Sequence, residues 1–132
     1  MNKKFLITGS LFAALAVALG AFGAHGLEKL TTDDKILKGF QTATQYQLYH
    51  ALALLAVAII YEKYPVRSVR LSGDLFIWGI VFFSGSLYLI TALKISESDF
   101  VKFAGPVTPI GGVFFIAGWI LLLLAFIIKK RS

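Results

Sequence analysis

The sequence alternates between long uncharged stretches and short segments that hold the charged residues. The uncharged stretches cover residues 5–26, 39–61, 75–93 and 103–128, and each has at least 19 residues. A helix needs about 20 mostly apolar residues to cross the hydrocarbon core of a bilayer. The pattern therefore predicts an all-α protein, a four-helix transmembrane bundle. We expect one domain over residues 1–132 with spans at about 5–24, 41–61, 75–93 and 109–128.

The first uncharged stretch also has features of a secretory signal peptide, because two lysines precede it and small residues surround Phe22. Its 22 residues exceed the 7–15 residues of an ordinary signal-peptide core. We therefore expect an uncleaved first helix. Ala16, Gly20 and Ala24 follow one another at intervals of four, so they form a stripe that lets a second helix approach closely. This stripe predicts that the first helix is the central packing element.

Local signals set the expected ends of two other helices. Thr32 is followed by two aspartates, which is typical of a helix N-cap with acids in the first turn. The second helix is therefore predicted to run from near Asp33 to about Tyr64, where Pro65 ends it. Two prolines and three glycines lie within residues 105–112. They predict a turn or short interfacial segment at 103–108 and a spanning helix from Pro109.

Composition supports a membrane protein. Apolar residues make up 58% of the chain and charged residues 15%, against about 25% charged in soluble domains. The sequence has no cysteine, which excludes disulfides and thiolate metal sites. The net charge of +6 comes from basic residues at the ends of the apolar stretches. Anionic lipid head groups at the cytoplasmic face are therefore the expected partner, and nucleic acid is not.

The distribution of basic residues predicts the orientation in the membrane. Four spans place both termini on one side, together with the segment that joins the second and third spans. That side has eight basic residues and the other side has five. Because basic residues are retained in the cytoplasm, we expect an N-in, C-in protein of the bacterial inner (plasma) membrane.

Polar side chains inside the spans are the candidates for chemistry. Five side chains form the candidate ligand-binding set: His25, Tyr46, Gln47, His50 and Thr108. On a helix Gln47 and His50 are three residues apart and Tyr46 and His50 are four apart, so both pairs share a face. His50 lies 11 residues from Tyr61, which is about 16 Å and close to the midplane. The cluster is either a small polar pocket that binds a ligand or relays a proton, or a set of interhelical hydrogen bonds. We favour the hydrogen bonds.

A resident cofactor is not expected. His25 and His50 are the only histidines, and the predicted helices place them at different depths. Two histidines without a cysteine or a nearby carboxylate make a poor zinc or haem site. No ionisable carboxylate, lysine or arginine lies in a span, and no catalytic motif is visible. We therefore expect no metal site, no cofactor and no enzymatic activity.

Glycines and prolines form a second candidate set, with a role in close packing of the backbone. Its members are Gly20, Gly23, Gly26, Gly85, Gly105, Pro106, Pro109, Gly111 and Gly112. A helix that starts at Pro109 has free backbone N–H groups and a positive dipole end, which could hold an anion or a carbonyl group. Tight packing of this helix start on its neighbours is the simpler interpretation, and we favour it.

Four ordered motifs resemble a known family. They read GAFGAHGL at 20–27, YQLYHALAL at 46–54, FSGSLY at 83–88 and GPVTPIGG at 105–112. With these motifs the chain resembles the small four-helix bacterial inner-membrane proteins grouped as domain of unknown function 423, to which a eukaryotic group of small transmembrane proteins is similar. The resemblance implies an uncleaved first helix and four spans, and it implies no activity. The motifs also include His25, Gln47, His50 and Thr108, which the resemblance suggests as a common site.

Three functional hypotheses follow. The first is a structural or partner-binding protein in the membrane, which acts as a homo-oligomer or with another membrane protein. The second is a small-solute carrier or channel, which requires a cavity that reaches Gln47 and His50. The third is a binder of a lipid-type or quinone-type ligand near His25, His50 and residues 105–112. The first hypothesis is the one we favour.

Overall fold

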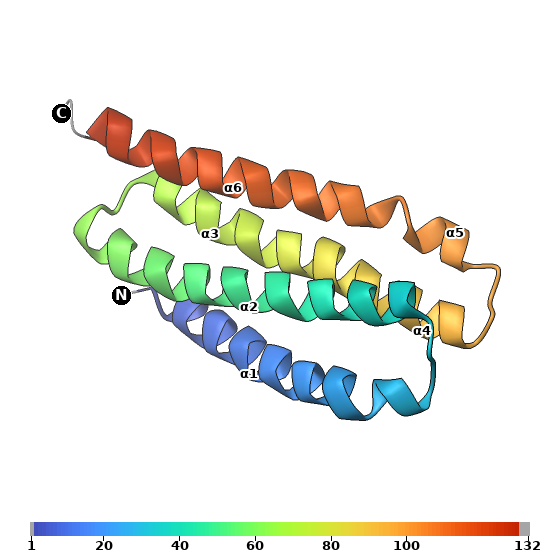
Figure 1. Cartoon of the computed structure of the whole chain (residues 1–132). Helices are drawn as coiled ribbons and strands as arrows, with labels where there is room; N and C mark the ends of the chain where they lie inside the picture. The colour runs from blue at the N-terminus through green and yellow to red at the C-terminus, as the bar shows by residue number, and fades with distance from the viewer. Residues whose placement is uncertain (1, 130–132) are drawn as a thin grey trace.

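The computed structural model describes residues 2–129, which form helices and short connections and no strand. The long helices are α1 (Lys3–His25), α2 (Asp34–Lys63), α3 (Arg67–Gly79), α4 (Gly85–Ile95) and α6 (Val107–Lys129). Three short elements complete the chain: η1 (Leu27–Lys29), the π-helical turn η2 (Ile80–Ser84) and α5 (Val101–Ala104). Figure 1 shows these elements along the chain.

Four helical segments are long and apolar enough to cross a membrane. They are Lys3–Lys29, Asp34–Lys63, Arg67–Ile95 and Val101–Ile128. The prediction of an all-α protein with four candidate spans is therefore confirmed. The second segment is 30 residues long, which corresponds to about 45 Å, so it extends beyond a hydrocarbon core of about 30 Å.

The N-cap of α2 is Asp33 and not Thr32, so the predicted cap was wrong by one residue. The Asp33 carboxylate accepts a hydrogen bond from the backbone N–H of Lys35 at 2.9 Å. A second bond stabilises the approach to the helix, because the backbone N–H of Asp33 donates to the hydroxyl of Thr31. Threonine and aspartate both cap helices well. Here the side chain that accepts from the first turn of the helix is that of Asp33.

The start of the last helix also differs from the prediction. α6 begins at Val107, two residues before Pro109, and α5 is a separate short helix that starts before the expected interfacial segment and overlaps its first two residues. A proline is tolerated at residue 109 because the first four N–H groups of a helix have no partner inside it. The predicted turn at 103–108 is therefore shorter than expected, and the helix incorporates the proline instead of starting at it.

The third span is interrupted by one π-helical turn. α3, η2 and α4 form one continuous rod in which residues 80–84 are wider than an α-helix. The Ser84 hydroxyl in this turn donates to the backbone carbonyl of Ala43 in α2 at 2.7 Å. Gly111 of α6 meets the other side of the turn, where a side chain would collide with the backbone of Phe83. The turn is therefore held between α2 and α6.

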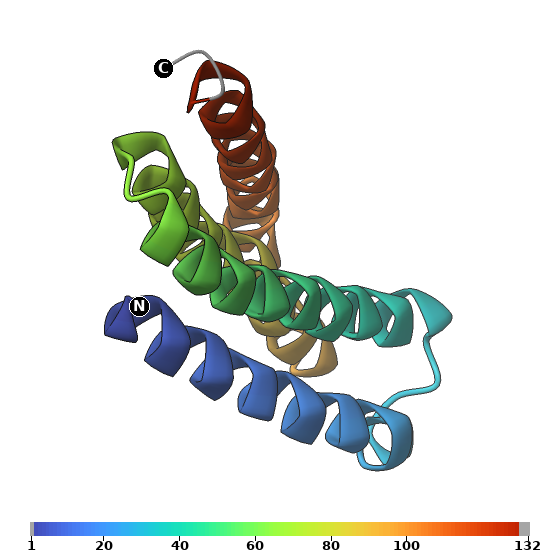
Figure 2. The same ribbon diagram turned by 90° about the vertical axis from the view of Figure 1, so that its left-hand side faces the viewer.

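The central helix of the bundle is α2, not α1 as the sequence predicted. The long helices lie in the order α1, α2, α3–α4 and α6 (Figures 1 and 2). In the most apolar 18-residue stretch of each helix, 50% of the α2 stretch is buried, compared with 17% of the α1 stretch. α2 has buried residues along its whole length, whereas the buried residues of α1 are Phe5, Gly9 and Ala16. The remaining surface of α1 is left for lipid.

Aromatic rings that fit against glycines form much of the core. Phe5, Phe76 and Phe115 are at most 5% exposed. A side chain added at Gly73, Gly79 or Gly118 would collide with the ring of Phe5, Phe115 or Phe76, respectively. Each pair joins two different helices, so the absence of a side chain on one helix creates the space for a ring from the next.

Both ends of the described chain lie at the same end of the bundle. α1 begins and α6 ends there, next to the connection between α2 and α3 (Figure 1). The ammonium group of Lys4 forms an ion pair with Asp74 of α3 at 2.7 Å at this end. The helices therefore cross the candidate membrane region an even number of times, as predicted.

Candidate functional site

Gln47 links three helices through its amide group. It lies in α2 and is 3% exposed. Its Nε2 donates to the backbone carbonyl of Phe12 in α1 at 2.8 Å. Its Oε1 accepts a hydrogen bond from the hydroxyl of Tyr88 in α4 at 2.6 Å. Both ends of the amide are therefore used inside the protein, which is what a buried amide requires.

His50 joins α2 to α6. Its Nδ1 lies 2.8 Å from the backbone carbonyl of Tyr46, and its Nε2 accepts from the indole N–H of Trp119 at 3.0 Å. A carbonyl only accepts and an indole N–H only donates, so the hydrogen is on Nδ1 and the ring is neutral. The ring stacks on Phe115 with centroids 3.6 Å apart and planes 9° apart. Both nitrogens are therefore occupied by the protein itself.

Thr108 belongs to a separate hydrogen bond nearer the end of the bundle. The hydroxyl of Ser86 donates to the backbone carbonyl of Phe83 at 2.9 Å, so the Thr108 hydroxyl is the donor in its short contact with Ser86 Oγ. This bond ties the start of α6 to α4 just after the π-helical turn. No described side-chain bond connects Thr108 with Gln47 or His50.

The other two candidates lie at the periphery. The side chain of Tyr46 is 40% exposed, and its ring packs on Phe83 with centroids 4.9 Å apart, so only its backbone carbonyl bonds to His50. His25 is exposed at the end of α1, and no hydrogen bond from its side chain to a described residue is present. The five predicted residues therefore do not converge on one cavity. Gln47 and His50 are one turn apart on α2 but bind different helices.

The packing set divides into tight and open positions. A side chain at Gly23 would lie 2.8 Å from the Phe40 ring, one at Gly26 would lie 2.7 Å from Phe22, and Gly111 lies against the backbone of Phe83. Four positions have no atom closer than 3.8 Å to an added Cβ: Gly20, Gly85, Gly105 and Gly112. The proline Pro106 lies between α5 and α6, and Pro109 lies in the first turn of α6.

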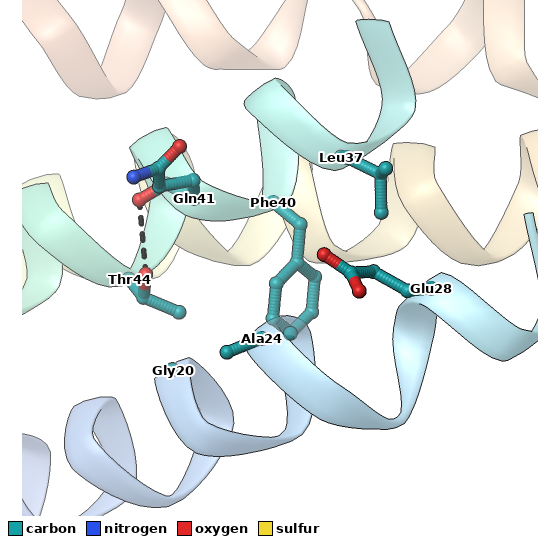
Figure 3. Close-up of a pocket in the computed structure, with 8 residues that line it drawn as sticks. Gly20, Ala24, Glu28, Leu37, Phe40, Gln41 and Thr44 are labelled. Atoms are coloured by element: carbon teal, nitrogen blue, oxygen red, sulfur yellow. Dashed lines mark hydrogen bonds between the residues drawn. The ribbon is translucent and has the colours of Figure 1, made fainter. Parts of the chain in front are cut away.

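A cavity of about 300 Å³ lies between the end of α1 and the start of α2 (Figure 3). It is lined by Gly20, Gly23, Ala24, Glu28, Leu37, Phe40, Gln41 and Thr44. Gln47, His50 and Thr108 are not among these residues. Of the lining residues, Gly20, Gly23 and Ala24 were singled out from the sequence, all three for close packing. The cavity therefore contains polar groups that sequence reasoning did not select.

Several partners of the predicted residues were also missed. Trp119 and Tyr88 supply the hydrogen bonds that fix His50 and Gln47, and the sequence does not pair them. A signal was present, because a tryptophan or tyrosine inside an apolar span needs a partner for its N–H or O–H. Ser84 and the carbonyl of Phe12 give no such signal, since neither differs from ordinary small or backbone groups in a span.

A family model described as "Protein of unknown function (DUF423)" matches residues 19–112. The chain belongs to this family. The match begins in α1 and ends in α6, so it includes Gln47, His50, Thr108 and the cavity. The resemblance noted in the sequence is thereby confirmed.

Relatives of similar length support the same assignment to the DUF423 family. The UPF0382 membrane protein YwdK of Bacillus subtilis is 47% identical over 124 residues, covering 93% of this chain and 95% of the relative. The UPF0382 membrane protein SSP2132 of Staphylococcus saprophyticus is 48% identical over 123 residues, covering 92% and 95%. No solved structure matches this one. Together with the four candidate spans, these relatives show that the chain is a membrane protein.

Proposed function

We propose that this protein is a non-catalytic scaffold of the bacterial inner membrane that acts by binding partners within the bilayer. The observation that carries this proposal is that the polar side-chain atoms of Gln47 and His50 already have hydrogen-bond partners within the chain. Both are buried, and each has its polar atoms bonded to other parts of the same chain. Groups used in this way hold helices in a fixed arrangement and have no free atom to offer a solute.

The neutral state of His50 also argues against proton relay. A second proton on the ring would face the indole N–H of Trp119, since both groups would then be donors. Relay through this position would require Trp119 to move away and α6 to separate from α2. The arrangement therefore favours a static connection between helices.

The carrier and ligand alternatives have less support at the predicted residues. A carrier requires a cavity that reaches Gln47 and His50, and the cavity between α1 and α2 is lined by neither. A ligand at His25 and His50 would have to touch an exposed residue at the end of α1 and a buried ring between α2 and α6. Partner binding instead needs an apolar outer surface. α6 supplies one, with Val113, Ile116 and Leu123 all more than half exposed.

The orientation proposed from the sequence is N-in and C-in. The end of the bundle where α1 begins has the larger share of basic residues, and these would contact anionic lipids at the cytoplasmic face. A homo-oligomer or a second membrane protein would pack against the exposed face of α6. Neither proposal needs a cofactor or a metal.

A comparison of stability with flux tests the proposed function. We would reconstitute the protein and its His50→Phe variant in liposomes and measure proton flux under a pH gradient, with protein-free liposomes as the baseline. We expect baseline flux from both proteins. We also expect a lower unfolding temperature for the variant, because the ring stays but the bond to Trp119 is lost.

A partner test complements the flux test. A photoreactive amino acid at Ile116, which is 62% exposed, should crosslink in cells to a defined protein or to a second copy. The same group at Phe115, which is 5% exposed, should give no intermolecular product. The scaffold proposal would be overturned if the wild-type protein conducts protons and the His50→Phe substitution removes that flux. Identical crosslinking at residues 115 and 116 would also overturn it.

A further inference from the structure

The cavity between α1 and α2 is open to the outside of the bundle. Ala24, Glu28 and Gln41, which line it, are all exposed. Its volume of about 300 Å³ is within the range of small-molecule sites, which is about 300–1,000 Å³. It lies at the end of the bundle opposite the chain termini (Figures 1 and 3). A molecule in the surrounding lipid layer can therefore reach it from the side.

One part of the cavity is an apolar slot. A Cβ added at Gly20 would meet no atom within 4 Å, so the missing side chain leaves open space at that point. Gly23 is different, because an added Cβ there would lie 2.8 Å from the Phe40 ring. Gly23 therefore lets Phe40 form one wall, and Gly20 leaves the space beside it. Gly20 belongs to the expected first span, so the slot is at the depth of hydrocarbon chains.

Hydrogen-bond acceptors line the cavity on both sides of the Phe40 ring (Figure 3). Glu28 projects from η1 toward Leu37 and Phe40 (Figure 3), and no side chain among the described residues forms an ion pair with it. The Thr44 hydroxyl uses its hydrogen in a 2.9 Å bond to the Gln41 carbonyl oxygen, so toward a ligand it can only accept. The Gln41 side chain adds an amide oxygen. The carboxylate of Glu28 therefore lies at the Leu37 end of the cavity, and the Thr44 and Gln41 acceptors lie on the other side of the Phe40 ring, toward Gly20 (Figure 3).

We propose that this cavity binds an amphiphile that has an ammonium head group and a hydrocarbon chain. An ammonium group has three donors and no acceptor, which complements the Glu28 carboxylate, a group that only accepts. Its positive charge also pairs with the Glu28 carboxylate. The hydrocarbon chain lies over Gly20 and against Phe40. A head group with a negative charge and no ammonium group, as in phosphatidylglycerol, would be repelled by the carboxylate of Glu28.

Two sources can supply this chemistry. One is an aminolipid of the surrounding leaflet, such as phosphatidylethanolamine, and the other is a free long-chain amine. The site does not depend on the scaffold proposal, because it is formed by other residues than Gln47 and His50. It lies at the opposite end of the bundle from the basic segments that we expect to contact anionic lipids.

Native mass spectrometry of the full chain in detergent tests the proposal. The probes are dioleoyl-phosphatidylethanolamine, dioleoyl-phosphatidylglycerol with the same chains, and dodecylamine. Gly20→Leu fills the slot, and Glu28→Gln removes the charge at the surface without a change in size. Gly39→Leu is the matched control, because a Cβ there also meets nothing within 4 Å and Gly39 does not line the cavity.

We expect wild-type protein and Gly39→Leu to bind phosphatidylethanolamine at least tenfold more tightly than phosphatidylglycerol. Gly20→Leu and Glu28→Gln should each lose about tenfold in affinity for the ammonium probe. The same variant pattern with dodecylamine alone would support the site and identify a free amine as its source. Equal binding of the two lipids with no amine adduct, or unchanged binding in Glu28→Gln, would overturn the proposal. Glu28 is exposed, so that variant tests the site even if Gly20→Leu folds poorly.

Discussion

The indole N–H of Trp119 donates to Nε2 of His50 across 3.0 Å, and this bond joins the last helix to the central one. The two rings come from positions 69 residues apart in the sequence. Next to the bond, Trp119 also packs on Phe76 with centroids 4.7 Å apart. The contact therefore combines one polar bond with aromatic packing, and the two contributions can be separated by substitution.

We predict a measurable coupling between His50 and Trp119. Trp119→Phe keeps an aromatic ring but leaves Nε2 of His50 without its donor, which should lower the free energy of unfolding by about 1 kcal/mol. His50→Phe should have a similar effect. The double variant should lose less than the sum, with a coupling of about 0.6 kcal/mol, since such bonds average this value in membrane proteins. Equilibrium unfolding in mixed micelles measures all three variants.

Trp78→Phe is the control for this cycle. Trp78 is 53% exposed on α3, and its indole N–H has no hydrogen-bond partner among residues 2–129. We expect its replacement to leave the free energy of unfolding unchanged within about 0.5 kcal/mol. Strict additivity of the His50 and Trp119 substitutions would show that the hydrogen bond contributes nothing to the bundle.

The second prediction concerns Gln47 and Tyr88. Tyr88→Phe removes the donor to Gln47 Oε1 and leaves that buried oxygen unpaired, at a cost of about 1–2 kcal/mol. Gln47→Met replaces the amide by an apolar chain of similar length, and in the Tyr88→Phe background it should recover part of this loss. The recovery is expected because no buried amide then remains unpaired. If the losses in the free energy of unfolding of the two single variants simply add up in the double variant, the hydrogen bond between Tyr88 and Gln47 is contradicted.

The third prediction tests the contact between α6 and the π-helical turn. Gly111→Ala would place a methyl group against the backbone N and Cα of Phe83, which cannot move as a flexible side chain can. We expect a loss of about 3 kcal/mol in the free energy of unfolding. Gly112→Ala is the matched control, since the nearest atom to its Cβ is Phe83 Cδ2 at 3.9 Å. It should be neutral or slightly stabilising because alanine favours helix more than glycine. Equal thermal stability of the two variants would refute the tight contact.

The fourth prediction concerns orientation. The chain has no cysteine, so single cysteines report accessibility without background. Asp99→Cys and Glu62→Cys each replace an exposed acidic residue, at opposite ends of the bundle. Acidic residues contribute little to orientation, so these changes should not alter it. A membrane-impermeant maleimide added to intact cells should label residue 99 directly and residue 62 only after the membrane is permeabilised. The reverse pattern would place both termini outside.

The sequence alone predicted the spans and their approximate ends. A helix in a bilayer satisfies its own backbone, so span position depends mainly on a local property, the length of uncharged apolar chain. For this reason the four spans, the end of α2 before Pro65 and the family motifs could all be recognised. The shifts at Thr32 and Pro109 are of one or two residues, because caps and first-turn positions are permissive.

The positions of the helices relative to one another were decided by the tertiary structure. The stripe of Ala16, Gly20 and Ala24 suggested a central α1. Small residues allow a neighbouring helix to approach closely, but they do not determine how many helices do so. The larger number of buried positions on α2 made it central instead. This property depends on the faces of all four helices at once, so no single stretch reveals it.

The candidate site shows the same division between sequence and structure. Gln47 and His50 could be selected from the sequence because a polar side chain in an apolar span needs a partner. Their partners, Tyr88, Trp119 and the carbonyl of Phe12, lie on three other helices, and only the packing brings them together. The cavity at Gly20 and Glu28 likewise arises where α1 and α2 meet. Local composition thus determined that this protein lies in the membrane, and contacts between distant residues determined which polar groups are occupied and which remain free.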